Sequence, residues 1–438
     1  MMSYYAKLAY LSICRTPVMS LLTVITLGIG IGVSMTTLSL FYMMSSNPLS
    51  HKNDVLYAVQ LDSYGKNETN RRVANHIPAH MTYQDTAALR QSDIPLRQVT
   101  MFSYGMAVTP AEEQKNPYIA QVRVSTRDFF AMFDVPFLYG GVWSKAADES
   151  PENVVVIDFQ TNEHLFNGRN SIGETMNLDG NLFTVIGVLE PWQIAIKVYD
   201  LNESDFEATE SLFIPFSLAK TMEMLPWGNV LSWTNPPSNT YQGFLQSETI
   251  WLQHWAELPT AETKRQFEQF IENYIREQKT QGRFQKPLSY ALSTPSQWIQ
   301  INGVVSDDNR ALVCLSLAFL VVCVVNALAL IMAKFIRAAS QVGVRRALGA
   351  SQSAIFYQHL FESGAMGLVG GGLGLIMAQG GLMAIDSLFN GQFDSVAKMD
   401  LLMMIACIVF AILASLFAGC YPAWRIAHTS PVIHLKTQ

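Results

Sequence analysis

The side chains of this sequence that could do chemistry include carboxylates, but none of them has a recognisable catalytic spacing. Asp128, Asp134, Asp148 and Glu149 come closest, because paired carboxylates can act as general acid and base. Acidic residues are abundant around them, so solvation at a surface explains them better. The sequence also lacks a G-x-S-x-G nucleophile motif and an H-E-x-x-H metal helix. We therefore expect no catalytic residues in this chain.

The cysteines and histidines indicate neither a metal site nor a disulfide framework. The five cysteines stand at positions 14, 314, 323, 407 and 420, so none lies between 45 and 309. No Cys/His spacing resembles a zinc site, and the eight histidines are scattered. We therefore expect no metal and no cofactor in this chain. The segment 45–309 is long enough to bury a core without disulfides.

Four stretches without a charged residue predict membrane spans. They cover 18–44, 311–333, 363–385 and 401–424, with 27, 23, 23 and 24 residues. Each exceeds the roughly 20 residues that a helix needs to cross a bilayer. A buried helix of a soluble protein could explain one such stretch, but hardly four. The first stretch is also longer than the roughly 7–15 apolar residues of a signal peptide, so we expect it to be retained.

Charge patterning predicts the orientation of these spans. The chain is 50% hydrophobic and 15% charged, with a net charge of −6. Residues 45–309 hold 31 acidic and 19 basic side chains, whereas the rest of the chain holds 4 and 10. This distribution excludes a nucleic-acid binder built on overall basicity. Basic loops face the cytoplasm, so residues 45–309 should face outward. The basic residues on the expected cytoplasmic side of the spans include Lys7, Arg15, Lys334, Arg337, Arg345, Arg346, Arg425 and Lys436.

The predicted fold is an α-helical membrane protein with four transmembrane helices and a large mixed α+β domain between the first two. The spans are expected at 18–44, 310–335, 354–388 and 400–424, and the outward domain at 45–309. The remaining segments are an amphipathic N-terminal segment at 1–17, a cytoplasmic loop at 336–353, a short outward loop at 389–399 and a cytoplasmic tail at 425–438.

Local patterns predict several elements of the outward domain. Residues 153–157 form an apolar run typical of a buried strand, and 176–188 form a hairpin with a type I′ turn at Asp179-Gly180. We expect Thr126 to cap a short helix that carries three phenylalanines. A longer amphipathic helix should begin at Thr260, within a β-α-β unit. Residues 195–245 show too little periodicity for an assignment.

Glycines are concentrated in the first and third spans. They stand four residues apart, which allows two helix backbones to approach closely in lipid. Glycine is also simply common in membrane helices, and a phosphate-binding loop is excluded because the glycines lie inside a span. The candidate packing residues are Gly28, Gly32, Gly367, Gly371 and Gly374.

Several motifs occur together in one order. In the outward domain, 124–140 read VSTRDFFAMFDVPFLYG, 154–157 read VVVI, 183–188 read FTVIGV and 213–216 read FIPF. The cytoplasmic loop reads VGVRRALGA at 342–350, and 419–423 read GCYPA. These segments resemble ABC transporter permeases of the MacB/FtsX-like family. The outward segments are similar to the MacB-type periplasmic core domain, and the loop is similar to the Arg-(Lys/Arg)-Ala-Leu-Gly-Ala signature of FtsX-like permeases.

The resemblance implies a permease of the bacterial inner membrane with a periplasmic domain of porter-like and Sabre-like parts. It also implies that a partner ABC ATPase, which binds ATP and Mg, moves this domain through the spans by mechanotransmission. The sequence has no G-x-x-x-x-G-K-(S/T) loop, so we expect the ATPase to be another chain. Residues expected to couple to it are Arg337, Gln341, Gly343, Arg345, Arg346, Ala347, Leu348, Gly349 and Ala350.

The sequence leaves more than one activity and more than one assembly open. Efflux of a drug, peptide or other periplasmic substrate is the leading hypothesis; an FtsX-like signalling permease that activates a cell-wall hydrolase and a lipoprotein-releasing permease are the others. Many relatives carry an acidic residue where Gln341 stands here, so a paralogous permease could replace a second copy in the dimer. A periplasmic adaptor and an outer-membrane channel are further expected partners, and no nucleic acid is expected.

Overall fold

The structure is a computed structural model that divides into two compact units. One unit holds residues 1–45 and 305–438, and the other holds residues 46–304. We call them the membrane unit and the outward unit. The structure describes residues 2–45, 47–66, 74–111, 116–192, 194, 196–201, 209–228, 230–304, 307–388 and 401–428.

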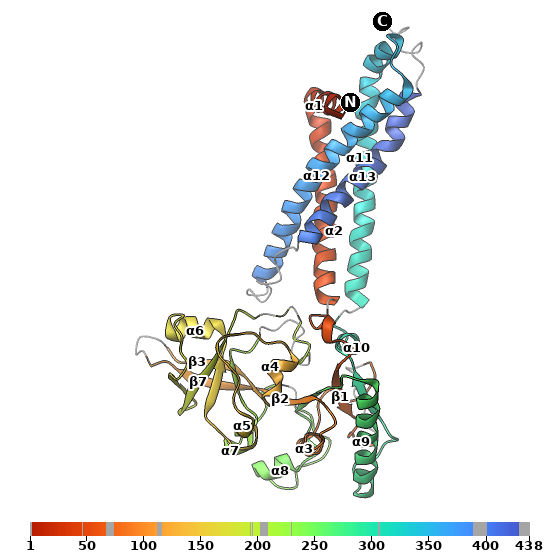
Figure 1. The fold of residues 1–438 in the computed structure, drawn as a ribbon. Helices are drawn as coiled ribbons and strands as arrows, with labels where there is room; N and C mark the ends of the chain where they lie inside the picture. Colours follow the sequence, from red (N-terminus) through yellow and green to blue (C-terminus); the bar gives the residue numbers. More distant parts are fainter. Residues whose placement is uncertain are drawn as a thin grey trace. The chain divides into compact units, whose positions relative to one another are not determined.

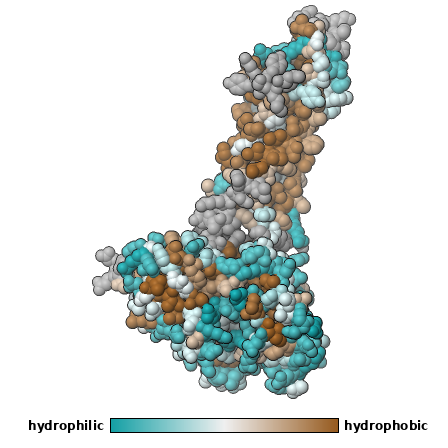
Figure 2. All heavy atoms as spheres, in the orientation of Figure 1, coloured by the Kyte–Doolittle hydropathy of each residue, from teal (hydrophilic) through white to brown (hydrophobic). Residues whose placement is uncertain are grey.

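The membrane unit is a bundle of long helices. Within the described residues, four of its helices are long and apolar enough to cross a membrane, as the sequence predicted. They pack along one another, with α12 beside both α2 and α13 (Figure 1). Figure 2 shows hydrophobic residues covering much of this bundle. The helices are α1 (Met2–Arg15), α2 (Pro17–Ser45), α11 (Asp307–Ala347), α12 (Gln352–Leu388) and α13 (Leu401–Ala427).

The segment 336–353, expected as a loop, is mostly helical. Helix α11 continues to Ala347 and α12 begins at Gln352, so only a short turn separates them. Alanine, arginine and glutamine favour a helix, which explains the continuation. Gly349 ends it with a φ of 100°, a conformation that glycine adopts without steric cost. The expected outward loop 389–399 lies outside the described residues, as does the tail beyond 428.

The outward unit is built on one mixed sheet with the order β10-β1-β9-β2-β3-β8-β5-β7-β4, and β6 pairs with β2 and β7. The long strand β2 connects the two ends of this sheet, because it pairs with β9 on one side and with β3 on the other. The strands are β1 (Leu56–Leu61), β2 (Arg97–Thr109), β3 (Tyr118–Ser125), β4 (Phe137–Gly140), β5 (Val154–Ile157), β6 (Thr175–Leu178), β7 (Asn181–Leu189), β8 (Leu212–Pro215), β9 (Gln253–Glu257) and β10 (Tyr290–Ser293).

Short helices cover this sheet, and one long helix, α9, packs at its β1–β9 end. Phe267, Ile271 and Ile275 of α9 are buried in a core that also contains Tyr57 and Val59 of β1. The helices of the outward unit are η1 (Ser50–Lys52), α3 (Tyr83–Leu89), α4 (Asp128–Met132), α5 (Lys145–Glu149), α6 (Phe159–Phe166), α7 (Leu218–Thr221), α8 (Tyr241–Leu245), α9 (Ala261–Thr280) and α10 (Pro295–Ile301).

Several local predictions are confirmed. Strands β6 and β7 form the expected hairpin, and Asp179 and Gly180 both have positive φ, at 48° and 81°. The Thr260 hydroxyl caps α9 by accepting from the Thr263 backbone N–H. Strands β9 and β10 both run antiparallel to β1, which lies between them, so α9 connects two parallel strands. The split into porter-like and Sabre-like parts stays a prediction.

One local prediction is wrong, and one unassigned segment contains regular structure. Thr126 does not cap α4, whose N-cap is Arg127; the Thr126 hydroxyl instead accepts from the Thr100 N–H and donates to the Gln98 carbonyl. The Thr126 hydroxyl therefore bonds to the backbone of β2, and this buried contact replaces the local helix cap. Residues 195–245, which had no assignment, contain β8, α7 and α8 in their described part.

Candidate functional site

The turn between α11 and α12, which we call the tip (residues 344–349), exposes apolar side chains. Leu348 is 84% exposed and Val344 is 48% exposed. Ala347 and Gly349 beside them are also exposed, so the tip presents a small surface that another protein could cover. Among the other predicted coupling residues, Arg337, Gln341 and Arg345 are exposed, Arg346 and Ala350 are half-buried, and Gly343 is buried.

The two arginines of the predicted coupling motif do not share one environment. Arg345 turns towards α12, where its Nη1 donates to Gln358 Oε1 at 3.0 Å. Gln341 faces α1, and its Oε1 accepts from Arg15 Nη1 at 3.3 Å. The structure therefore connects part of the motif to the rest of the bundle, while Val344 and Leu348 point into solvent.

The predicted packing glycines lie at two helix contacts, one between α2 and α12 and the other between α12 and α13. A Cβ atom at Gly28 would lie 2.8 Å from the Leu373 side chain, and one at Gly32 would lie 2.8 Å from Met377. Gly374 faces Ile31 in the same contact between α2 and α12. The other face of α12 packs on α13, where Gly367 meets Ser415 and Gly371 meets Ala411.

A buried charge cluster, which the sequence reasoning missed, lies between α1, α2, α11 and α12. Lys334 Nζ lies 2.5 Å from Glu362 Oε1, and it donates to Ser20 Oγ at 2.8 Å. The Ser12 hydroxyl donates to the same carboxylate at 2.6 Å, and His359 Nδ1 lies 3.3 Å from Glu362 Oε2. We call Ser12, Lys334, His359 and Glu362 the bundle cluster.

The sequence contained a signal for this cluster. Lys334 ends one uncharged stretch and Glu362 precedes another, and both are at most 2% exposed. Lys334 was interpreted only as a sign of cytoplasmic topology. Because buried ionisable residues in membrane segments pair with each other, two opposite charges at neighbouring span ends could have indicated the contact.

Two of the four carboxylates considered for catalysis, Asp134 and Asp148, have structural partners. Asp148 accepts from the Trp143 indole N–H at 2.8 Å and from the Arg127 backbone N–H at 3.0 Å. Burial raises the pKa of Asp148, and these hydrogen bonds offset the rise only in part. Asp134 pairs with Lys52 and with His51, whose hydrogen bonds lower the pKa of Asp134 against the effect of burial. In the described part of the chain, no group of His, Cys, Asp and Glu gathers as a metal site.

A second buried charge cluster, formed by Arg123, Lys197, Asp200 and Glu210, lies inside the outward unit. Arg123 Nη2 pairs with Asp200 at 2.7 Å and also with Glu210, while Lys197 Nζ lies 3.0 Å from Glu210. Burial would raise the pKa of Glu210, but the two cations lower it to about 2. We call these four residues the outward cluster.

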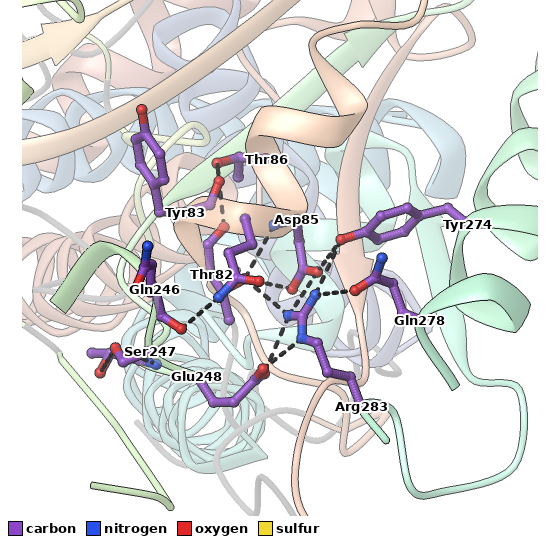
Figure 3. Close-up of polar contacts among 12 residues, drawn as sticks. Thr82, Tyr83, Asp85, Thr86, Gln246, Ser247, Glu248, Tyr274, Gln278 and Arg283 are labelled. Carbon is purple, nitrogen blue, oxygen red and sulfur yellow. Dashed lines mark hydrogen bonds and ion pairs between the residues drawn. The ribbon is translucent and has the colours of Figure 1, made fainter. Parts of the chain in front are cut away.

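A third polar cluster fastens α9 to the rest of the outward unit (Figure 3). Arg283 contacts Glu248 at 2.5 Å and Asp85 at 2.9 Å, and the Tyr274 hydroxyl donates to Asp85 at 2.7 Å. Asp85 is fully buried. Its neighbour Thr82 donates to the same carboxylate at 2.7 Å. The charged groups of this cluster therefore bond to one another, which indicates a structural role.

Comparison with protein families gives two matches in chain order. The MacB-like periplasmic core domain matches residues 20–247, just over half of the chain. The FtsX-like permease C-terminal family matches residues 313–431. The second match contains both α12 and the tip.

Among curated proteins, the chain is 21% identical to the Macrolide export ATP-binding/permease protein MacB of Syntrophobacter fumaroxidans, over 71% of this chain and 46% of the relative. It is 24% identical to the Pyoverdine export ATP-binding/permease protein PvdT of Pseudomonas aeruginosa, over 73% of this chain and 43% of the relative. The matches therefore cover less than half the length of either relative.

Two solved structures overlap part of the chain. The periplasmic region of MacB from Actinobacillus actinomycetemcomitans covers 58% of this chain, with 11% identity and a TM-score of 0.36. The extracellular domain of the noncanonic ABC-type transporter YknZ from Gram-positive bacteria covers 55%, with 14% identity and a TM-score of 0.34.

Proposed function

Because the chain belongs to the family of MacB-like ABC permeases with an FtsX-like C-terminal region, we propose that it couples ATP hydrolysis by an ABC ATPase to movement of its outward unit. In this proposal the chain sits in a bacterial inner membrane, and the outward unit lies in the periplasm. The work done on the substrate is mechanical, and the ATPase is a partner chain that binds ATP and Mg.

The observation that carries this proposal is the continuity of α2 and α11. Helix α11 has 41 residues and α2 has 29, so their lengths are about 60 Å and 44 Å, against roughly 30 Å of hydrocarbon. Along the chain, α2 ends just before the outward unit and α11 begins just after it. The two helices contact each other where Ser34 Oγ donates to the Ser316 carbonyl at 2.9 Å. A displacement at the tip can therefore be transmitted along unbroken helix.

Packing inside the bundle also favours a mechanical role for these helices and argues against a substrate channel between them. Leu27, Ile31, Ala327 and Ile331 are each 0% exposed and fill the space between the helices. Close-packed side chains transmit displacement, because a core of this density is not freely compressible. The substrate would then be moved by the outward unit without passing between these helices.

The tip is the proposed ATPase contact. An exposed leucine beside small residues suits a shallow groove on a partner, with Leu348 as the inserted side chain. Arg345 and Gln341 already contact α12 and α1, so Val344, Ala347 and Leu348 carry the contact. Of the residues expected to couple to the ATPase, this proposal relies on Ala347 and Leu348, and it adds Val344.

The proposed activity is efflux of a periplasmic substrate. The names of two relatives refer to macrolide export and pyoverdine export, which supports export over signalling or lipoprotein release. A second permease, either a copy or a paralogue, would complete the membrane part of the assembly. A periplasmic adaptor and an outer-membrane channel would receive the substrate.

Leu348→Glu tests the proposed ATPase contact. The full chain, co-expressed with its partner ABC ATPase, should lose about tenfold in ATPase affinity, because a carboxylate would have to be buried in the groove. Leu182→Glu is the matched control, since Leu182 is 64% exposed but lies in the outward unit. Copurification and ATP turnover that stay unchanged in Leu348→Glu would refute the contact.

A further inference from the structure

A small polar hollow lies in the membrane unit beside the bundle cluster. It has a volume of about 70 Å³ and is lined by residues of α1, α11 and α12. One buried water needs roughly 10–15 Å³, so the hollow has room for a group of several heavy atoms. Its polar lining consists of Ser12, Arg15, Gln341, Arg345, Gln358 and His359.

Two arginines that line this hollow, Arg15 and Arg345, carry positive charge that no carboxylate neutralises in the described part of the chain. Arg15 and Arg345 each donate to a neutral amide oxygen, on Gln341 and Gln358 respectively. Neither forms an ion pair with any carboxylate in the described part of the chain. The nearby Glu362 is occupied by Lys334, Ser12 and His359. The hollow therefore favours an anionic ligand.

An unpartnered buried atom gives a second indication of a ligand. The His359 side chain is only 4% exposed, and its Nδ1 faces Glu362. Its Nε2 has no hydrogen-bond partner within the described ranges. Buried polar atoms are almost always paired, so this nitrogen calls for a partner that the chain itself does not supply.

We propose that the hollow between α1, α11 and α12 binds the phosphate group of an anionic phospholipid headgroup. A guanidinium matches the geometry of phosphate oxygens, and two of them converge here. The hollow lies at the end of the bundle where basic residues predict the cytoplasmic leaflet, and basic pockets between membrane helices suit anionic headgroups. A bound headgroup would fasten α1 to α11 and α12. In the imidazolium form of His359, Nδ1–H donates to Glu362 and Nε2–H would donate to a phosphate oxygen.

This site uses other side chains than the proposed ATPase contact, which depends on Val344, Ala347 and Leu348. Arg345 belongs to the tip and is exposed, but its guanidinium donates to Gln358 on α12, whereas Leu348 is 84% exposed and has no such contact with the bundle. Lipid binding can therefore be tested independently of ATPase binding. Its failure would leave the coupling function as it stands.

The test is native mass spectrometry of the delipidated full chain in detergent, with added phosphatidylglycerol or phosphatidylethanolamine. The wild-type chain should retain phosphatidylglycerol in preference to phosphatidylethanolamine. Each arginine near a headgroup contributes about fivefold in affinity, so Arg15→Gln with Arg345→Gln should weaken retention by about 25-fold. Arg337→Gln should have no effect, because Arg337 is an exposed α11 arginine outside the hollow.

A second variant separates a loss of lipid binding from a loss of folding. Gln341→Glu places a carboxylate beside Arg15, so it adds an ion pair while it competes with the headgroup for charge. It should lower phosphatidylglycerol retention by about fivefold without lowering the melting temperature of the lipid-free chain.

Three results would overturn the proposal. One is unchanged phosphatidylglycerol retention in the double variant or in Gln341→Glu, and another is an equal loss in Arg337→Gln. The third is displacement of the lipid by an equal concentration of inorganic phosphate, which would make free phosphate the ligand. If the double variant lost only ATPase binding and kept lipid retention, the hollow would serve a protein.

Discussion

The outward cluster is closed, because each of its cations is matched by a carboxylate, whereas the bundle cluster borders a hollow with two arginines that no carboxylate matches in the described part of the chain. In the outward unit, two cations face two carboxylates, and all four side chains are at most 2% exposed. In the membrane unit, Lys334 and Glu362 balance each other, yet Arg15 and Arg345 nearby have only amide partners. A closed cluster holds a fold together, whereas unmatched arginines beside a cluster have charge left for a ligand.

The largest effect should come from opening the closed cluster. Arg123→Met would leave Asp200 and Glu210 buried with Lys197 alone, at a cost of about 3–5 kcal/mol in the free energy of unfolding. Hydrogen exchange of β3 and β8 in the full chain measures this loss. Arg169→Met is the control, because Arg169 and Glu174 form an exposed pair worth about 0–1 kcal/mol. Equal protection of β3 in the two variants would contradict the account.

A somewhat smaller effect is expected in the membrane unit. Lys334→Met leaves the Glu362 carboxylate buried without its cation, which should cost about 3 kcal/mol. Lys334→Met combined with Glu362→Met removes both charges and should recover part of that loss. Thermal unfolding of the three variants in detergent gives the coupling between the two side chains. Losses that simply add would mean that the pair does not interact.

The pH dependence of the outward unit should sharpen the comparison. The pKa of Glu210 is lowered to about 2 in the folded chain, from an ordinary value of 4.5. Its stabilising contribution is therefore complete above about pH 4.5 and lost as the pH falls towards 2. Glu210→Gln should show a shallower decline in β8 protection over this range. A wild-type decline no steeper than that of the variant would refute the assigned pKa shift.

The smallest of these effects concerns helix packing in the bundle. Gly32→Leu forces a side chain against Met377 and the Gly374 carbonyl, so about 1–3 kcal/mol of stability should be lost. Gly372→Leu is the matched control, since a Cβ there meets nothing within 4 Å. Gly30→Leu cannot serve as a control, because Gly30 faces Cys323 on α11. Melting temperatures that fall equally in Gly32→Leu and Gly372→Leu would contradict this packing.

Local signals account for what the sequence predicted well. The Asp179-Gly180 turn, the Thr260 cap and the four apolar spans each depend on residues close together in the chain. The bundle cluster depends on residues far apart in the chain. Opposite charges at two span ends indicate that Lys334 and Glu362 could pair, but the full cluster forms only through the packing of α11 and α12 on α1 and α2. Likewise, the spacing of Gly28 and Gly32 indicated a helix contact but not that the partner is α12.

The central claim is that ATP moves the outward unit through α2 and α11. Spin labels at Leu182→Cys in the outward unit and at Val321→Cys on α11, with the five native cysteines replaced, would report this movement by electron–electron double resonance. Both positions are more than half exposed, at 64% and 62%. With the ATPase bound, adding ATP and Mg should shift the distance distribution, and Leu348→Glu should abolish the shift. Identical distributions with and without ATP would contradict the account.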